Sequence, residues 1–315
     1  MAGINRNRTA LVIGGSGQIG SRLIPELAAA GYEPRGTYWK NPAPGLWPLD
    51  LSSPDAVEEA IAGFKPGLCV LSAAMTHVDR CEDEPELARK INAEAPGRAA
   101  KACRALGARL CLLSTEYVFD GAAGPYDERA KPSPLSVYGR TKLAGEERVL
   151  EESPRNLVAR TTVVFSWSPG GNNFIMQLRQ SLGAGRAMRV AADQVSTPTY
   201  APDLAKALAR LLVLEDSGIW NLAGPDLLGR CDFALQACRA LGLPESLVEP
   251  VATKDLQQRA PRPLQAGLAT GKLRARLGPA IRGAREALED IRRLAPRPTP
   301  AAARIIGESR RPRAS

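Results

Sequence analysis

The chain has almost no histidine: His77 is the only one in 315 residues. That scarcity excludes metal sites built from several histidines and argues against a Ser-His-Asp hydrolase. The six cysteines form no C-x-x-C pair and fit no zinc spacing, so we expect reduced thiols, no metal site and a cytoplasmic protein. No apolar run approaches the ~18 residues that a membrane span requires. The segment before Thr9 lacks the apolar region and cleavage site of a secretory signal.

Positive charge is concentrated near the end of the chain. The formal net charge is +9, yet residues 1–250 carry 27 Lys+Arg against 28 Asp+Glu, and residues 251–315 carry 15 against 5. A nearly neutral body does not favour nucleic acid as a partner. Because the Arg-rich end follows a Pro-rich stretch at 296–300, we predict that residues 296–315 form a basic, disordered tail.

Strand and helix signals alternate along the first part of the chain. Several of the strand segments are nearly continuous apolar runs, which is typical of a sheet covered on both faces. The alternation predicts an α/β fold, a Rossmann-type doubly wound parallel sheet. The expected strands are 9–13, 33–38, 68–71, 109–113 and 156–160, and the expected helices are 19–30, 53–63 with Ser53 as N-cap, 85–106 and 136–152.

The pattern loosens after residue 165, where helices are expected over 174–183, 203–214 and 232–241, with a strand at 219–222. We predict an NAD(P)-binding Rossmann domain of residues 1–165, to which 196–224 return. Residues 166–195 and 225–295 are expected to form a smaller, interleaved C-terminal lobe that binds the substrate.

Gly14, Gly17 and Gly20 give the spacing G-x-x-G-x-x-G between the first strand and the first helix. Such glycines permit a tight turn and close approach to a pyrophosphate, which the helix N-terminus then meets. We therefore favour dinucleotide binding over a purely structural turn. The second strand ends without the acid that accepts a ribose 2′-OH in NAD sites. Arg35 or Lys40 could face a 2′-phosphate or be solvated surface cations, so NADP(H) is favoured over NAD(H).

Tyr138 and Lys142 form a Y-x-x-x-K pair on one face of a predicted helix. A nearby ammonium favours phenolate, so we expect the pKa of Tyr138 to be lowered and its phenol to act as a general acid. Thr115 follows a predicted strand, at the sheet edge where α/β proteins bind ligands. These three residues are the expected catalytic group.

Together these motifs resemble the extended short-chain dehydrogenase/reductases, and most of all their dTDP-4-dehydrorhamnose reductase branch. The resemblance covers about residues 8–280. The matching segments are 14–20, 50–51, 73–79 with Cys81 and Glu82, Asn92, 114–121, 138–146, 193–199, 221–224 and 262–263.

The resemblance implies a set of binding residues. His77 is then a loop residue near the ligands and not a catalyst. The expected substrate residues are Thr115, Val118, Phe119, Asn173, Gln194, Thr197 and Arg262. The expected cofactor residues are Gly14, Gly17, Gln18, Ile19, Gly20, Thr37, Lys40, Asp50, Leu51, Ala73, Ala74, Thr76, Asn92, Ser114, Tyr138 and Lys142.

Three positions depart from the branch. Glu116 replaces an aspartate, Val163 stands where a tryptophan often walls the sugar pocket, and Ser21 replaces a glutamate used in a magnesium-linked dimer. The implied function is an NAD(P)H-dependent reductase of a nucleotide-linked 4-keto sugar, with a homodimer as its candidate assembly. Two alternatives remain: an epimerase or dehydratase that retains NAD⁺, and a non-catalytic regulatory subunit similar to the beta subunit of methionine adenosyltransferase.

Overall fold

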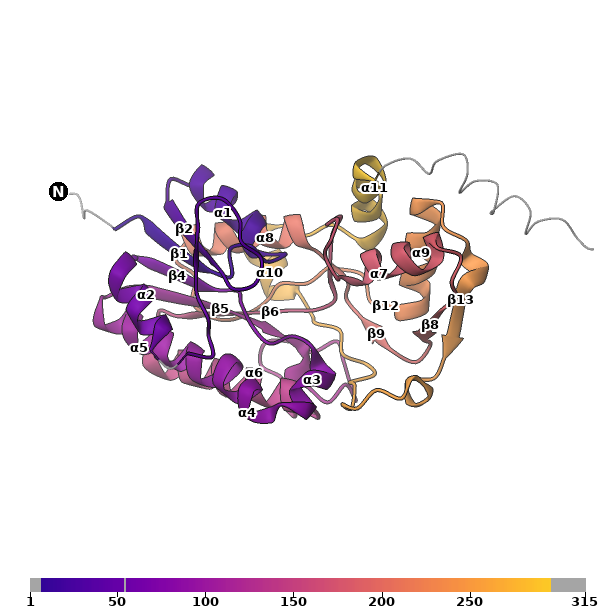
Figure 1. Cartoon of the computed structure of the whole chain (residues 1–315), viewed down its shortest axis with the longest axis horizontal. Helices are drawn as coiled ribbons and strands as arrows, with labels where there is room; N and C mark the ends of the chain where they lie inside the picture. The colour runs from indigo at the N-terminus through magenta and orange to yellow at the C-terminus, as the bar shows by residue number, and fades with distance from the viewer. Residues whose placement is uncertain (1–6, 54, 296–315) are drawn as a thin grey trace, which may run out of the picture.

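A computed structural model of the chain describes residues 7–53 and 55–295 (Figure 1). The predicted basic tail at 296–315 lies outside the described residues. Within the described ranges, no helix has the length and apolar character needed to cross a membrane.

The centre of the fold is a parallel sheet of seven strands in the order β3-β2-β1-β4-β5-β6-β11. The strand order reverses between β1 and β4, which is the switch point where open α/β sheets bind ligands beyond the carboxyl ends of their strands. The predicted doubly wound parallel sheet is confirmed. The strands are β1 (Thr9–Ile13), β2 (Glu33–Tyr38), β3 (Leu46–Pro48), β4 (Leu68–Leu71), β5 (Arg109–Thr115), β6 (Leu157–Thr161) and β11 (Gly218–Asn221).

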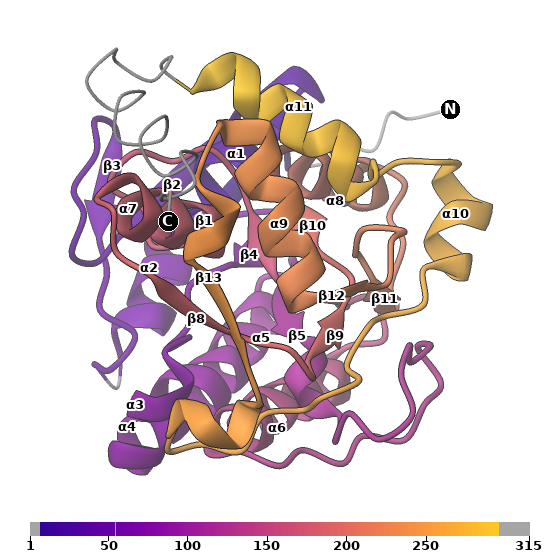
Figure 2. The same cartoon turned by 90° about the vertical axis from the view of Figure 1, so that its right-hand side faces the viewer.

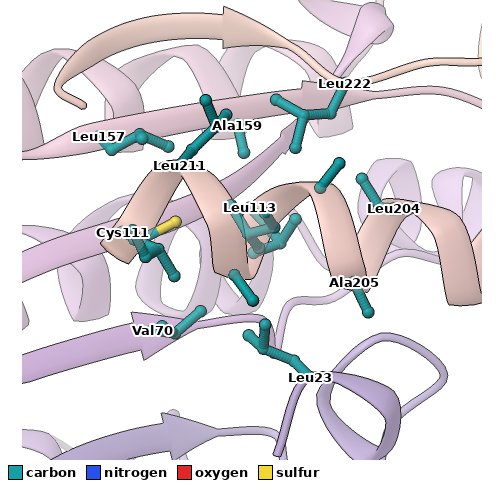
Figure 3. Close-up of a cluster of buried hydrophobic side chains, with 14 of the residues drawn as sticks. Leu23, Val70, Cys111, Leu113, Leu157, Ala159, Leu204, Ala205, Leu211 and Leu222 are labelled. Carbon is teal, nitrogen blue, oxygen red and sulfur yellow. The ribbon is translucent and has the colours of Figure 1, made fainter. Parts of the chain in front are cut away.

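Successive side chains of a strand point to opposite faces of the sheet, so each central strand feeds two cores. In β1, Ala10 and Val12 belong to one buried cluster, whereas Leu11 and Ile13 belong to the other. Figure 3 shows the first cluster, in which Leu23 of α1 and Leu204 and Leu211 of α8 lie against the sheet. This double burial explains the continuous apolar runs.

Helices cover both faces of the sheet (Figure 1). On one face lie α1 (Gly20–Ala29), α8 (Ala201–Val213) and α10 (Gly271–Leu277). On the other lie α2 (Ala56–Phe64), α3 (Val78–Asp83), α4 (Pro85–Arg89), a π-helical turn η1 (Lys90–Glu94), α5 (Ala95–Ala105) and α6 (Val137–Glu152).

A third core joins elements from the later part of the chain, which lie beside the sheet in Figure 1 and face the viewer in Figure 2. Its elements are α7 (Phe174–Gly183), β8 (Met188–Ala191), α9 (Arg230–Leu241), β13 (Val248–Val251) and α11 (Ala284–Leu294). Leu273 and Leu277 of α10 pack instead on the core of the sheet, although they fall within the segment expected to form the substrate lobe. Short ladders pair β7 (Val164–Phe165) with β10 (Thr199–Tyr200), and β9 (Val195–Ser196) with β12 (Leu228–Gly229).

Among the differences between the predicted and the observed elements, three lie in the sheet domain and its helices. Ser53 is not an N-cap, because α2 begins at Ala56 and Asp55 precedes it. The edge strand β3 has no sequence signal, since it is three residues long and ends in a proline. The expected helix 85–106 is continuous in space but contains the π-helical turn η1.

Candidate active site

The glycine loop is built where only glycine fits. Gly14 has φ +91°, and a Cβ there would lie 2.8 Å from the Ala73 nitrogen. A Cβ on Gly20 would lie 2.2 Å from the Gly14 carbonyl oxygen. Helix α1 starts at Gly20 and has no acidic residue in its first turn, so no carboxylate of the helix itself neutralises the positive end of the helix dipole. The loop therefore fits a dinucleotide pyrophosphate.

A cavity of about 210 Å³ lies at the carboxyl ends of β1, β2 and β4. Asp50, whose carboxylate accepts hydrogen bonds from Ser52, is on its wall, as is His77, whose Nδ1 caps α3 by accepting from the Arg80 nitrogen. Sequence analysis missed Trp39 and Arg80, which carry no recognisable motif. The predicted residues that line the cavity are Gly14, Thr37, Asp50, Leu51, Ala73, Ala74 and Thr76.

Other predicted cofactor residues do not line this cavity. The Gln18 amide donates to the Val164 carbonyl and the Ser166 hydroxyl, both at 3.2 Å, so it ties the loop to the segment after β6. Lys40 is exposed, with its ammonium 4.0 Å from the centre of the Trp39 ring. Gly17 donates its N–H to Gly14, and Ile19 packs against the core of the sheet.

Asn92 connects the cavity wall to α6. Its amide oxygen accepts from the Met75 nitrogen at 2.9 Å, and its amide nitrogen donates to the Met75 carbonyl at 3.0 Å and to Thr141 Oγ1 at 3.3 Å. Met75 lines the cavity, and Thr141 lies between Tyr138 and Lys142 on α6. The π-helical turn thus links the cavity wall at Met75 to α6 at Thr141.

Thr115, Tyr138 and Lys142 converge at the carboxyl end of β5. Ser136 caps α6 by accepting from the Gly139 nitrogen at 3.2 Å, and the close approach of Gly139 to the Tyr117 carbonyl leaves no room for a Cβ. The Thr115 hydroxyl interacts with the Tyr138 phenol and lowers its pKa. The Tyr138 ring meets the Tyr117 ring edge-on, with centroids 5.5 Å apart.

Lys142 is fully buried, and its ammonium donates to the Leu113 carbonyl at 2.6 Å. Burial lowers the pKa of Lys142 to about 8, and the Glu146 carboxylate opposes that shift. Burial, followed by the Glu116 carboxylate, raises the pKa of Tyr138 above its ordinary value. The expectation that Lys142 lowers the pKa of Tyr138 is therefore wrong for this arrangement, because the ammonium is directed to the backbone of β5.

A buried ion pair lies next to Ser114, the residue that precedes Thr115. Arg160 and Glu146 are each 2% exposed, and Arg160 Nη2 lies 2.6 Å from Glu146 Oε2. Ser114 also donates to the Glu146 carboxylate. The guanidinium lies 5.1 Å from the centre of the Phe119 ring. Ser114, expected to bind cofactor, is therefore held by Glu146.

Glu116 is a second buried carboxyl at the end of β5. Thr115 Oγ1 donates to its Oε2 at 3.0 Å. Burial raises the pKa of Glu116 to about 7. The Thr162 hydroxyl opposes this rise in the pKa of Glu116, although no hydrogen bond of ordinary geometry joins the two groups.

Several predicted substrate residues serve the fold. Val118 and Phe119 are buried in a small core, where Phe119 stacks on Tyr126 with centroids 4.2 Å apart. The Asn173 side chain caps α7, and Thr197 Oγ1 accepts from the Leu268 nitrogen. Asn173 and Thr197 therefore have hydrogen-bond partners within the chain.

Gln194 and Arg262 also have partners within the chain. The Gln194 amide donates to Thr253 Oγ1 at 3.1 Å. Arg262 pairs with Asp79 at 2.9 Å and is 8% exposed.

Arg230, at the start of α9, is a cation that sequence analysis missed. Its guanidinium lies 4.3 Å from the centre of the Phe174 ring and interacts electrostatically with Tyr117 and Glu116 at the end of β5. Burial lowers the pKa of Arg230. Among the residues that the structure describes, no carboxylate forms an ion pair with it. It therefore brings positive charge to the carboxyl end of β5.

A larger cavity, of about 400 Å³, lies at the opposite, amino-terminal edge of the sheet. None of the predicted site residues lines it. Arg109 on its wall donates to the carbonyls of Arg155, Leu212 and Asp216, so this guanidinium is engaged by the backbone. Cavity size alone therefore does not mark the site.

Comparison with known proteins agrees with this geometry. The RmlD substrate binding domain family matches residues 8–294. The chain belongs to this family. A dTDP-4-dehydrorhamnose reductase of Mycolicibacterium smegmatis is 35% identical over 285 residues, which cover 89% of this chain and 84% of that protein.

Solved structures of family members superpose closely on the chain. A dTDP-4-dehydrorhamnose reductase of Clostridium acetobutylicum has a TM-score of 0.82 at 31% identity, covering 91% of this chain and 99% of its own. The enzyme of Bacillus anthracis in complex with NADP has a TM-score of 0.83 at 28% identity, covering 92% and 100%. Membership in the family agrees with the resemblance drawn from the motifs.

Proposed function

We propose that the protein is an NAD(P)H-dependent reductase of the keto group of a nucleotide-linked 4-keto sugar. The observation that carries this proposal is the convergence of Thr115, Tyr138 and Lys142 at the carboxyl end of β5. The chain belongs to a family that includes proteins named dTDP-4-dehydrorhamnose reductase.

Each side chain has a defined part in the reduction. The nicotinamide supplies hydride to the carbonyl carbon. Thr115 positions the carbonyl oxygen, and Tyr138 donates the proton. The raised pKa of Tyr138 keeps the phenol protonated before transfer. Lys142 holds the carboxyl end of β5 through Leu113 and supplies positive charge beside the nicotinamide ribose.

The cofactor proposed is NADP(H). The glycine loop would hold the pyrophosphate, and the cavity beside Asp50 and Leu51 would hold the adenine. Strand β2 ends at Tyr38 and is followed by Trp39 and Lys40, without an acid to repel a 2′-phosphate. The solvent-exposed Lys40, whose ammonium lies over the ring of the cavity-lining Trp39, is our candidate cation for it. Replacing Lys40 with Ala should weaken NADPH binding and leave NADH binding unchanged, whereas Lys206→Ala, on the outer surface of α8, should change neither.

Arg230 is the proposed anchor for the diphosphate of the substrate. It faces the end of β5 from the third core, which agrees with a substrate lobe built from residues 166–195 and 225–295. A guanidinium pairs well with phosphate oxygens, and burial strengthens the pairing. Arg230→Leu should raise KM for the nucleotide sugar. Arg239→Leu is the matched control, because Arg239 lies on the same helix but pairs with Glu245 at the surface.

The deciding experiment follows NADPH oxidation with a panel of nucleotide-linked 4-keto sugars. Tyr138→Phe should abolish turnover and leave NADPH affinity nearly unchanged, whereas Tyr32→Phe, at the amino edge of the sheet, should retain full activity. If Tyr138→Phe reduces the substrate at the native rate, Tyr138 is not the proton donor. Purification with a full complement of NAD⁺ would favour an epimerase or dehydratase. A tightly bound protein partner with no hydride transfer would favour a regulatory subunit.

A cytoplasmic location is proposed from the six cysteines, all of which are free thiols. We also predict a homodimer, which a measurement of the molar mass in solution by light scattering would test.

A further inference from the structure

Glu116 is a buried carboxyl close enough to the proposed proton donor, Tyr138, to raise its pKa, and the Thr115 hydroxyl interacts with both groups. Thr115 Oγ1 donates to Glu116 Oε2 at 3.0 Å and accepts from the Tyr117 nitrogen at 3.2 Å. On its other side it interacts with the Tyr138 phenol. The Thr115 hydroxyl therefore has the Glu116 carboxyl as its hydrogen-bond partner and the Tyr138 phenol as a neighbour.

The surroundings of Glu116 keep both of its protonation states accessible. The groups that face it are Thr115 on β5, Thr162 after β6, Tyr117 and Tyr138, and the Arg230 cation on α9. Burial raises the pKa of the carboxyl to about 7, and the hydroxyls and Arg230 hold it from rising further. Near neutral pH the site contains both carboxylic acid and carboxylate.

The two states direct the Thr115 proton in opposite ways. Beside a carboxylate, the Thr115 O–H must donate to Glu116, as the observed contact has it. Beside a carboxylic acid, the Glu116 O–H can donate across the same distance, and the Thr115 O–H is then free to turn toward Tyr138. Only the carboxylic acid form of Glu116 can supply a proton to Thr115, and through it to Tyr138.

We propose that Glu116 regenerates the Tyr138 proton after each reduction, with Thr115 as the relay. This rests on the proposed function. Hydride from the nicotinamide forms the C–H bond, the carbonyl π electrons pass to oxygen, and that oxygen takes the Tyr138 proton. The resulting phenolate takes the Thr115 proton as Thr115 takes the proton of the Glu116 acid. Solvent protonates the Glu116 carboxylate before the next turnover.

The relay predicts that loss of Glu116 affects later turnovers but not the rate of the first one. Tyr138 begins with its own proton, so Glu116→Gln should leave the single-turnover rate unchanged and lower the steady-state kcat roughly tenfold. The wild-type kcat should fall as the pH rises through about 7, and this fall should be absent in Glu116→Gln. Glu116→Asp should restore both the rate and the pH dependence. Equal slowing of first and later turnovers, or an unchanged pH profile, would overturn the relay.

A second measurement does not depend on turnover. Carbon-13 NMR of the protein labelled in glutamate carboxyls follows Glu116 directly, since Glu116→Gln identifies its signal. The carboxyl should titrate near pH 7, and higher still in Thr115→Val, which removes a hydrogen bond to the carboxylate. Titration near 4.5 would overturn the relay. A wild type that oxidises no NADPH with any 4-keto sugar would instead refute the proposed function.

Discussion

The Glu146–Arg160 ion pair makes the protein sensitive to a single isosteric change. Glu146→Gln preserves the shape of the side chain but removes the charge that balances Arg160, and both groups are 2% exposed. Arg160 Nη1 already lacks a partner within the described part of the chain, so the guanidinium has no alternative carboxylate. Breaking one side of a buried pair costs about 3–5 kcal/mol. We expect the free energy of unfolding to fall by about that amount.

Urea denaturation followed by circular dichroism measures this loss, with Glu245→Gln as the matched control. Glu245 pairs with Arg239, but their side chains are 41% and 63% exposed, so the control should unfold almost as the wild type does. The double variant Glu146→Gln/Arg160→Met removes both charges and should regain most of the lost stability. If Glu146→Gln is no less stable than the control, the buried pair does not stabilise the fold as argued.

Three further results are expected. Gly20→Ala should abolish NADPH binding, measured by titration calorimetry, because its Cβ would lie 2.2 Å from the Gly14 carbonyl oxygen. Gly63→Ala on α2 has open space around it, so scanning calorimetry should instead show a protein more stable by about 0.5–1 kcal/mol. Between pH 8 and 10.5 the unfolded chain holds a proton on Lys142 that the folded protein has released, so Lys142 adds a contribution to the unfolding free energy that rises with pH. Buried thiols whose pKa is raised contribute the opposite slope in both proteins, so the test is the difference: across this range the unfolding free energy of the wild type should rise relative to that of Lys142→Met, and a constant difference would contradict the lowered pKa of Lys142. Asn173→Ala should cost about 1 kcal/mol of stability through loss of the α7 cap, and Asn173→Asp should restore it; an unchanged melting curve for the Ala variant would contradict the capping role.

The gaps in the sequence-based site have a common origin. Gln194 and Thr197 were expected to meet substrate, and each forms a hydrogen bond with a residue distant in sequence, Thr253 and Leu268 respectively. Arg230 has no motif, and its importance arises from the way α9 packs toward the end of β5. Hydrogen-bond partners distant in sequence decide whether a polar side chain is available to a ligand.

The sequence alone determined the parallel sheet, the glycine loop and the Tyr-Lys helix, because strand burial, close backbone approach and helical spacing are local or periodic constraints. Only the tertiary structure decided the protonation chemistry. The direction of the Lys142 ammonium toward Leu113, the raised pKa of Tyr138 and the titration of Glu116 near neutrality all depend on burial and on charges from distant segments. Desolvation is a property of the assembled interior, so no spacing of residues along the chain could have indicated it.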